Sequence, residues 1–325
     1  MTTQLNRQIV LASRPVGEPK SSDFKLVESV AREPEAGEVL CRSIYLSLDP
    51  YMRGRMSAAK SYAKPVEIGG VMEGGVVGEV LNSNFPGIQT GDLVVGSGGW
   101  QEYFTLRGES LRIIDPERAP ISTALGVLGM PGVTAYSGLL NIGKPESGET
   151  VVVAAASGAV GSAVGQIAKI LGLRSVGIAG GSEKCRYVKE ELQFDDCLDY
   201  KSGNFAEKLG LACPDGIDIY FENVGGEVTK TVAPLLNQGA RVPICGYISN
   251  YNDEDITKAE TPFHILKQLK TVPEHRFFVV YEWQDRYEEA TRQLGQWTKD
   301  GLLKYRESIG EGLENAPELF RGLLK

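Results

Sequence analysis

The stretch 151-VVVAAASGAVG-161 decides the fold of this chain. It starts as a short apolar strand and turns at glycine, and an apolar helix pattern follows up to Leu171. Against the pattern G-x-G-x-x-G, Ala156 stands at the first position, Gly158 at the second and Gly161 at the third. A turn of this kind between a buried strand and a helix is typical of dinucleotide-binding α/β domains.

Each residue of this turn has a physical role toward a dinucleotide. Gly158 lets the backbone approach a pyrophosphate without a Cβ in the way, and Gly161 lets the helix pack close to the strand. The free N–H groups at the start of the helix, from Ala159 and Val160 onward, offer a partial positive charge to phosphates. The alternative is a glycine-rich turn that binds nothing. We prefer a binding turn because it opens a long series of strands and helices.

Working outward, the length of 325 residues suggests two domains at about 150 residues each. From residue 150 onward strands alternate with helices, which predicts a doubly wound parallel sheet of the Rossmann type. The first part of the chain is β-rich and punctuated by glycine. We therefore predict an α/β protein with a dinucleotide-binding domain over residues 126–297 and a β-rich substrate domain over residues 1–125, completed by residues 298–325, with the active site in the cleft between them.

The periodicity places the individual elements. Ser182 is expected to cap the helix that it starts, because a serine hydroxyl can accept from a free amide at a helix end. The predicted strands are Glu38–Tyr45, Thr150–Ala155, Ser175–Ala179, Cys197–Asp199, Ile217–Asn223, Ala240–Gly246, Arg276–Val280 and a charged, strand-like piece at Lys304–Ser308. The predicted helices are Ala159–Leu171, Ser182–Leu192, Asn204–Ala212, Glu227–Leu236, one that begins near Tyr287, and Ala316–Leu324.

Composition excludes several other functions. The formal net charge of −8 argues against a nucleic-acid partner or an anionic membrane surface. The run of residues 151–168 reads as strand, turn and helix rather than a membrane span. Five scattered cysteines with no Cys-x-x-Cys pair argue against a disulfide framework or a zinc lobe, so we expect no metal site and a cytoplasmic, reducing location. The first residues also lack the long apolar run of a signal peptide.

The end of the second strand distinguishes NADPH from NADH. An NAD-binding domain usually ends that strand with an acid that accepts from the ribose 2′-hydroxyl. This chain has Gly180 and Gly181 there, and Lys184 follows. Small residues leave room for a 2′-phosphate and the lysine can pair with it, so we predict NADPH. Glu183 fits this less well, although an acid in the first turn of a helix is favourable in its own right.

Several longer motifs are typical of one enzyme family. In chain order they are 45-YLSLDPYMRGRM-56, 129-GMPGVTAY-136, the turn that ends at Gly161, 222-ENVGG-226 and 245-CGYISNYN-252. Together they resemble the zinc-independent branch of the medium-chain dehydrogenase/reductase superfamily, and within it the prostaglandin reductase / leukotriene hydroxydehydrogenase family. The resemblance covers nearly the whole chain. It implies a GroES-like substrate domain and a homodimer joined through the cofactor domains.

The resemblance also implies which residues contact the cofactor. Lys184 and Tyr200 would meet the 2′-phosphate side, and Asn223 lies at the carboxyl end of a strand, where ligands of such sheets bind. The nicotinamide half would lie along Cys245, Gly246, Tyr247, Ile248, Ser249, Asn250 and Tyr251, and along Phe278, Val279 and Val280. Family members usually continue past Lys325 with a glycine-rich turn, an asparagine near the cofactor and a last strand.

The activity that the resemblance implies is NADPH-dependent reduction of the carbon–carbon double bond of α,β-unsaturated ketones and aldehydes. Tyr51, Tyr62 and Tyr251 are the candidates to donate to the substrate carbonyl, and Tyr251 has the best claim because it follows the nicotinamide segment. Each could instead be a packing residue with one hydrogen bond. Two other functions remain open at this point: a quinone reductase of the same superfamily, and a non-catalytic NADPH-binding redox sensor or structural protein.

Overall fold

The computed structural model describes residues 4–59, 61–254 and 258–324 and divides into two compact units. Unit 1 comprises Met1–Leu125, Tyr251–Glu254 and Ser308–Lys325, and unit 2 comprises Gly126–Asn250 and Asp255–Glu307. The C-terminal share of unit 1 thus begins at Ser308, later than residue 298, where the sequence prediction placed it. The chain passes from unit 2 to unit 1 between Asn250 and Tyr251.

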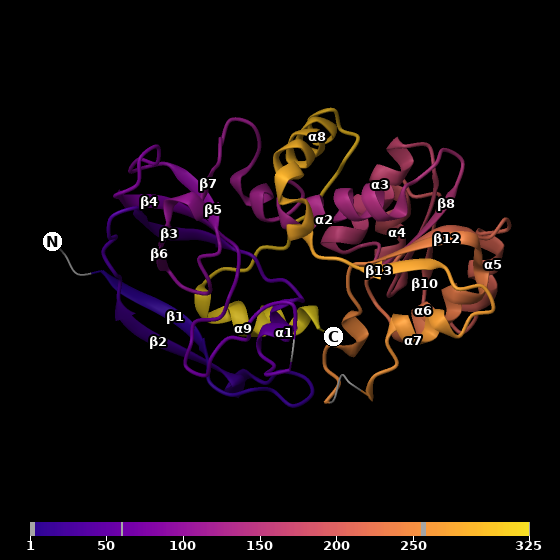
Figure 1. The fold of residues 1–325 in the computed structure, drawn as a ribbon, viewed down its shortest axis with the longest axis horizontal. Helices are drawn as coiled ribbons and strands as arrows, with labels where there is room; N and C mark the ends of the chain where they lie inside the picture. The colour runs from indigo at the N-terminus through magenta and orange to yellow at the C-terminus, as the bar shows by residue number, and fades with distance from the viewer. Residues whose placement is uncertain (1–3, 60, 255–257, 325) are drawn as a thin grey trace. The chain divides into compact units, whose positions relative to one another are not determined.

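Unit 2 is built on a six-stranded sheet in which every neighbouring pair is parallel (Figure 1). In sheet order the strands are β10 (Asp196–Asp199), β9 (Arg174–Ala179), β8 (Thr150–Ala154), β11 (Ile217–Phe221), β12 (Leu236–Ile244) and β13 (Glu274–Phe277). The strand order reverses beside β8, the first strand of the unit, as in a doubly wound fold. The predicted α/β fold class is confirmed.

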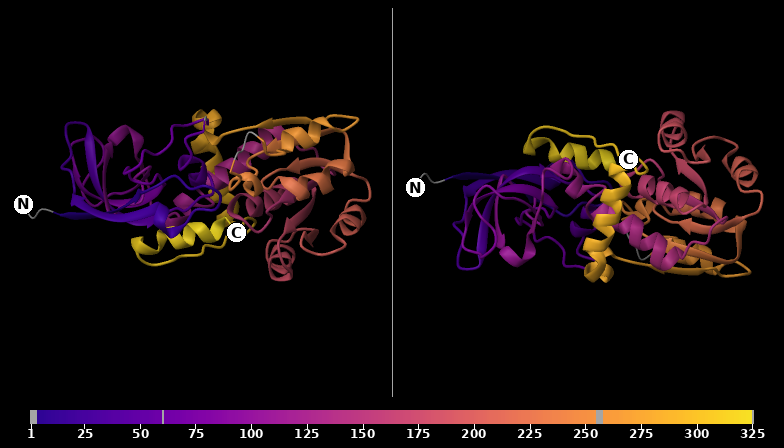
Figure 2. Two further views of the ribbon diagram at one scale, coloured as in Figure 1. Left: turned by 90° about the horizontal axis from the view of Figure 1, so that it is seen from below. Right: turned by 90° about the horizontal axis from the view of Figure 1, so that it is seen from above.

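Helices cover both faces of this sheet, as the views in Figure 2 show. Side chains of β8 explain the division, because Val151 and Val153 pack into one core while Val152 and Ala154 pack into the other. The first core is completed by α2 (Met130–Gly138), α3 (Ala159–Ile170), α4 (Ser182–Glu190) and α8 (Tyr287–Lys299). The second is completed by α5 (Phe205–Ala212), α6 (Gly226–Val232) and α7 (Pro262–Lys267). Burial on both faces is the reason that β8 is apolar along its length.

Two local predictions for unit 2 are wrong. Ser182 does not cap α4; it is the first helical residue, Gly181 is the N-cap, and no side-chain cap bond forms there. The stretch Lys304–Ser308 is not a strand. The side chain of Gln166 takes the place of a neighbouring strand, because its amide nitrogen donates to the Lys304 carbonyl at 2.9 Å and its oxygen accepts from the Lys304 N–H at 2.8 Å. Within the described residues, no helix is both long and apolar enough to span a bilayer.

Unit 1 contains two antiparallel sheets. β1 (Leu5–Leu11) pairs with β2 (Phe24–Val30). The second sheet has the order β6 (Tyr103–Arg107), β3 (Glu38–Leu46), β4 (Val76–Ser83), β5 (Leu93–Gly96) and β7 (Arg112–Ile113). Two helices, α1 (Met52–Arg55) and α9 (Ala316–Leu323), contribute side chains to a hydrophobic core of unit 1.

Three aromatic rings from distant parts of the chain form the centre of that core. Phe24 stacks on Trp100 with ring centroids 5.6 Å apart, and Phe320 of α9 meets Trp100 edge-on, also at 5.6 Å. Trp100 and Phe320 are fully buried. Aromatic pairs of this geometry stabilise a fold beyond the area that they bury. The C-terminal helix is therefore an integral part of unit 1.

The close approach of α3 to the turn after β8 gives a stability prediction. A Cβ at Gly161 would lie 2.3 Å from the carbonyl oxygen of Ala155, so Gly161→Ala forces the helix away from the strand. We expect a loss of about 1–3 kcal/mol, the usual cost of overpacking, seen as a lower thermal unfolding midpoint.

Gly210 of α5 is the matched control for this substitution. Among the described residues, no atom outside its own helix backbone and chain neighbours lies within 4 Å of its Cβ position. Gly210→Ala should therefore raise the midpoint, since alanine in a helix is favoured over glycine by about 0.5–1 kcal/mol. Equal effects of the two substitutions would contradict the close-approach argument.

Candidate active site

The turn after β8 presents free backbone groups at the start of α3. Gly158 is the N-cap residue, with φ −81° and ψ 171°, and both Gly158 and Ala159 are exposed. The positive φ of this turn, +52°, belongs to Ala155. Ala156, at the first motif position, therefore does not need to be glycine and is buried. The exposed start of a helix of twelve residues has the geometry of an anion-binding turn.

The second candidate region lies at the carboxyl ends of β9 and β10. Lys184 is exposed in the first turn of α4, and Tyr200, 42% exposed, follows β10 directly. A Cβ on Gly180 would lie 3.0 Å from the ring of Tyr200, so the glycine lets the phenol ring lie against the backbone after β9. The structure therefore brings the Tyr200 ring to the end of the second strand.

Lys201 is a cation of this region that the sequence interpretation missed. Its ammonium lies 5.8 Å from the centroid of the Tyr200 ring, and its side chain is exposed. The carboxylate of Asp199 holds the two strand ends together, because it accepts from the N–H of Gly181 at 2.9 Å and from the N–H of Lys201 at 3.0 Å. These two bonds lower the pKa of Asp199 and keep it ionised. The position next to Tyr200 was the available signal for Lys201.

A buried carboxylate organises the end of β11. Glu222 is fully buried and accepts hydrogen bonds from the N–H groups of Val224 at 2.7 Å and Gly225 at 2.9 Å. Its second oxygen accepts a short hydrogen bond from the Thr229 hydroxyl. Burial raises the pKa of Glu222, and the three hydrogen bonds oppose this shift. Glu222 belongs to the motif 222-ENVGG-226, but the sequence alone indicates no role for it.

Asn223 connects three strand ends. Its side-chain nitrogen donates to the carbonyl of Ala154 at the end of β8, with a distance of 2.8 Å. Its own carbonyl accepts from Ile248 at 3.1 Å, and the carbonyl of Val224 accepts from Ser249 at 2.9 Å. Asn223 and the segment after β12 are thus fixed where the strand order reverses, the place at which such sheets bind ligands.

The predicted nicotinamide segments differ in what they expose. Gly246 and Asn250 are buried, Cys245, Tyr247 and Ile248 are half-buried, and Ser249 is exposed. Burial raises the pKa of the Cys245 thiol to about 12, so the thiol stays neutral at neutral pH.

The other segment lies mainly in the core of unit 2. Phe278 is 3% exposed, its ring centroid lies 6.1 Å from that of Phe221, and Val280 belongs to the same core. Its neighbour Val279 is half-buried. A ligand could therefore meet the backbone of this segment and the side chain of Val279, whereas the rings and methyl groups beside it serve packing.

The three candidate tyrosines all belong to unit 1. Tyr51 is half-buried immediately before α1, and Tyr251 is half-buried immediately after the short 3₁₀ helix Ile248–Asn250. Tyr62 is 52% exposed. The guanidinium of Arg55 lies 4.3 Å from the ring centroid of Tyr62 and 5.8 Å from that of Tyr51, so these two rings share one cation.

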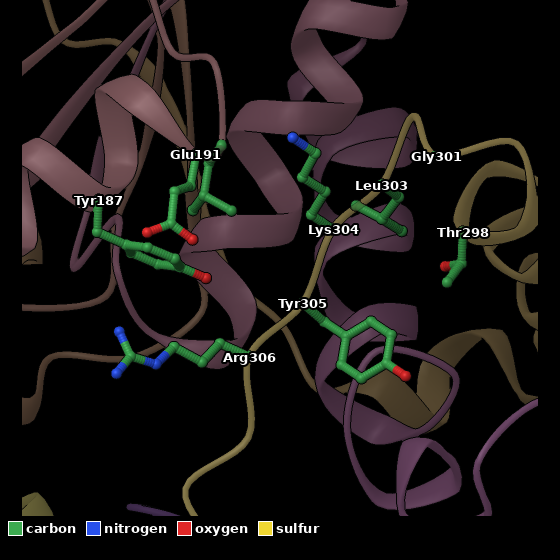
Figure 3. Close-up of a pocket in the computed structure, with 9 residues that line it drawn as sticks. Tyr187, Glu191, Thr298, Gly301, Leu303, Lys304, Tyr305 and Arg306 are labelled. Carbon is green, nitrogen blue, oxygen red and sulfur yellow. The ribbon is translucent and has the colours of Figure 1, made fainter.

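A groove of about 420 Å³ lies elsewhere on unit 2 (Figure 3). It is lined by the C-terminal end of α4 and by the segment after α8, with Tyr187, Glu191 and Arg306 among its side chains. The guanidinium of Arg306 lies 5.7 Å from the ring centroid of Tyr187. No predicted site residue lines this groove. In the part of the chain that the structure describes, no group of three or more His, Cys, Asp or Glu could hold a metal ion.

Known proteins resemble the chain along nearly its whole length. Residues 7–114 match a family described as the N-terminal domain of oxidoreductase, and residues 159–295 match one described as zinc-binding dehydrogenase. The chain is 52% identical to the NADPH-dependent curcumin reductase of Escherichia coli (strain K12), over 99% of this chain and 94% of that protein. It is 41% identical to prostaglandin reductase 1 of Bos taurus, over 95% and 93%.

A solved structure has the same fold. CurA from Vibrio vulnificus in complex with NADPH matches with a TM-score of 0.92 and 51% sequence identity, covering 98% of this chain and 95% of that one. The motifs also resembled bacterial NADPH-dependent curcumin reductase in particular, and this likeness and the family are both confirmed. The chain belongs to the medium-chain dehydrogenase/reductase family, in the group that includes prostaglandin reductase 1 and the curcumin reductases.

Proposed function

We propose that this chain uses NADPH to reduce the carbon–carbon double bond of α,β-unsaturated ketones and aldehydes, curcumin-like enones among them, by hydride transfer to the β-carbon. The observation that carries the proposal is the 52% identity to the E. coli NADPH-dependent curcumin reductase over 99% of the chain. A tobacco protein named 2-alkenal reductase (NADP(+)-dependent) is 38% identical over 98% of the chain. Both names describe NADP-dependent reductases.

The residues of unit 2 fit such a cofactor. The turn Gly158–Gly161, exposed at Gly158 and Ala159, would hold the pyrophosphate at the start of α3. The ammonium groups of Lys184 and Lys201 would balance the 2′-phosphate beside the Tyr200 ring, which Gly180 lets lie against the backbone. Asn223 and the segment from Cys245 to Asn250 would line the nicotinamide half, together with the backbone around Val279. Bound NADPH supplies the hydride of the reaction.

The tyrosines would stabilise the charge that develops on the substrate. As the β-carbon gains hydride, negative charge builds on the carbonyl oxygen. A phenol with a pKa near ~10 is protonated at neutral pH and can donate a hydrogen bond to that oxygen. We assign this role to Tyr251, and we assign Tyr51 and Tyr62 to the substrate side as further polar contacts.

Three finer points belong to the same proposal. We propose that the protein is a homodimer joined through unit 2, because β10 and β13 are edge strands of an open sheet and pairing across a two-fold axis would satisfy their free backbone groups. Light scattering at micromolar concentration measures this. We also propose that the protein works in the cytoplasm, where its free cysteines would stay reduced. We further propose that no zinc takes part, as the family resemblance implies.

An acceptor panel tests the proposed activity. NADPH oxidation followed at 340 nm should be fast with an enone, much slower with a quinone and negligible without an acceptor. Prior treatment with EDTA should leave the rate with the enone unchanged. If the protein binds NADPH but does not oxidise it with any of the acceptors tested, the proposal is contradicted. A preference for the quinone over the enone would identify the protein as a quinone reductase.

The cofactor preference depends on Lys184. A charge-assisted contact to a phosphate contributes about 1.5–3 kcal/mol, so Lys184→Ala should weaken NADPH binding on the order of tenfold or more and change NADH binding little. Lys201→Ala should shift the same preference in the same direction. Fluorescence titration with both cofactors measures the effect, and exposed Lys299, at the end of α8, provides the control Lys299→Ala. Equal losses of binding affinity for NADPH and NADH would show that Lys184 does not contact the 2′-phosphate.

The proposed donor is tested by removing one hydroxyl. Tyr251→Phe keeps the ring, so the unfolding midpoint and NADPH affinity should hardly change. If the bond strengthens in the transition state, kcat should fall more than KM rises, by about 10- to 1,000-fold. Tyr281→Phe, which removes a hydroxyl from a side chain that is 70% exposed, is the control and should keep the wild-type kcat. A wild-type kcat for Tyr251→Phe, when hydride transfer limits the rate, would exclude this role.

A further inference from the structure

We propose that Arg53 and Arg55, the two arginines of the short helix α1, are positioning residues that hold the three substrate-side tyrosines in place. The inference rests on the proposed function, because it concerns how the tyrosines reach their working arrangement. All the residues involved belong to unit 1.

Both arginines are buried to a degree that calls for a reason. Arg53 is 4% exposed and Arg55 is 3% exposed, in a helix of only four residues. Charged side chains are almost never fully buried unless they are paired, because their desolvation is costly. Burial lowers the pKa of Arg53, and the charge of Asp23 opposes this shift. The contacts that each guanidinium makes must therefore compensate for its burial.

Arg55 connects two of the tyrosines. Its guanidinium lies over the ring of Tyr62, 4.3 Å from the centroid, and 5.8 Å from the centroid of Tyr51. The same group donates to the carbonyl of Ala63 at 3.2 Å, which anchors the loop that carries Tyr62, and pairs with Glu73 at 3.4 Å. A planar guanidinium can stack on a ring and donate from its edge at the same time. Arg55 thus fixes both the face of the Tyr62 ring and the backbone beside it.

Arg53 reaches the third tyrosine through its neighbour. Its Nε donates to the side-chain oxygen of Asn252 at 3.2 Å, and one terminal nitrogen donates to the carbonyl of Gly17 at 2.8 Å. Asn252 follows Tyr251 directly, and its side-chain nitrogen donates to the carbonyl of Leu324 at 3.4 Å. Arg53 and Asn252 therefore connect the short segment Tyr251–Glu254 to Gly17 and Leu324 of unit 1.

These contacts give α1 a defined task. Tyr51 precedes the helix, Tyr62 is held by Arg55, and the residue after Tyr251 is held by Arg53. Lysine cannot replace either arginine, because one ammonium on a flexible stem makes neither the stacked contact nor the forked pair of bonds. The competing explanation is that the arginines merely stabilise unit 1, and this explanation makes a different prediction for catalysis.

The experiment compares Arg55→Met, Arg55→Lys and Arg53→Met in the full-length protein with a matched control. Arg14 also donates to the end of α1, from a terminal nitrogen to the carbonyl of the C-cap residue Met56 at 3.0 Å, and its ion pair is with Glu67 at 4.0 Å. The measurements are kcat and KM for the enone, NADPH affinity by fluorescence, and the thermal unfolding midpoint. We expect each Arg53 and Arg55 variant to lose about tenfold or more in kcat with NADPH affinity within twofold of the wild type. Arg14→Met should lower the midpoint and keep kcat.

A double-mutant cycle separates positioning from stability. If Arg55 acts through Tyr62, then Arg55→Met combined with Tyr62→Leu should cost no more in kcat than the larger single effect. Additive losses, or a wild-type kcat in folded Arg55→Lys and Arg53→Met, would overturn the inference. The rates are read with whichever acceptor the wild type reduces. If the wild type reduces only quinones, the proposed function is contradicted, but the double-mutant cycle still tests the role of the arginines. If the wild type reduces no acceptor at all, both the proposed function and this inference are contradicted.

Discussion

The buried carboxylate of Glu222 is the constraint on which the cofactor side of this molecule depends. A carboxylate that is sealed from water must have its oxygens satisfied, and here two backbone N–H groups and one hydroxyl do so. That requirement gives the turn after β11 a single arrangement. Asn223, which the turn carries, then bonds to the end of β8 and to the segment after β12. One buried carboxyl group thereby fixes three strand ends at the place where an open α/β sheet binds its ligand.

Unit 1 uses buried ionisable side chains in a related way, but here they are arginines. Arg53 and Arg55 place two guanidinium groups in its interior, and their donors bind loop carbonyls, an asparagine and aromatic faces rather than strand ends. In both units the regular sheets supply the frame, and a few expensive polar contacts determine how the irregular segments lie on it. Such segments gain a fixed geometry that hydrophobic packing alone does not give, because apolar contacts are not directional.

The sequence predicted those features that depend on local pattern. The apolar run before Gly158 and the glycine at position 161 were sufficient for the first turn, since strand, turn and helix there are contiguous, and the alternation of strands and helices after it predicted the parallel sheet. It failed where a distant side chain decides the outcome. The amide of Gln166 satisfies the backbone at Lys304, so an alternating charged stretch does not become a strand. The partners of Glu222 could be suspected from its motif, but the contacts of Arg55 with residues at positions 62, 63 and 73 could not.

The aromatic core of unit 1 also sets an order for folding during synthesis. Domains usually fold as units, the N-terminal one first. Here the pair of Trp100 and Phe24 is completed by Phe320, which is translated after every residue of unit 2. The aromatic core of the β-rich unit is therefore complete only after all the strands of the α/β unit have been translated. The unit whose chain is mostly translated first is thus the last to receive all the side chains of its core.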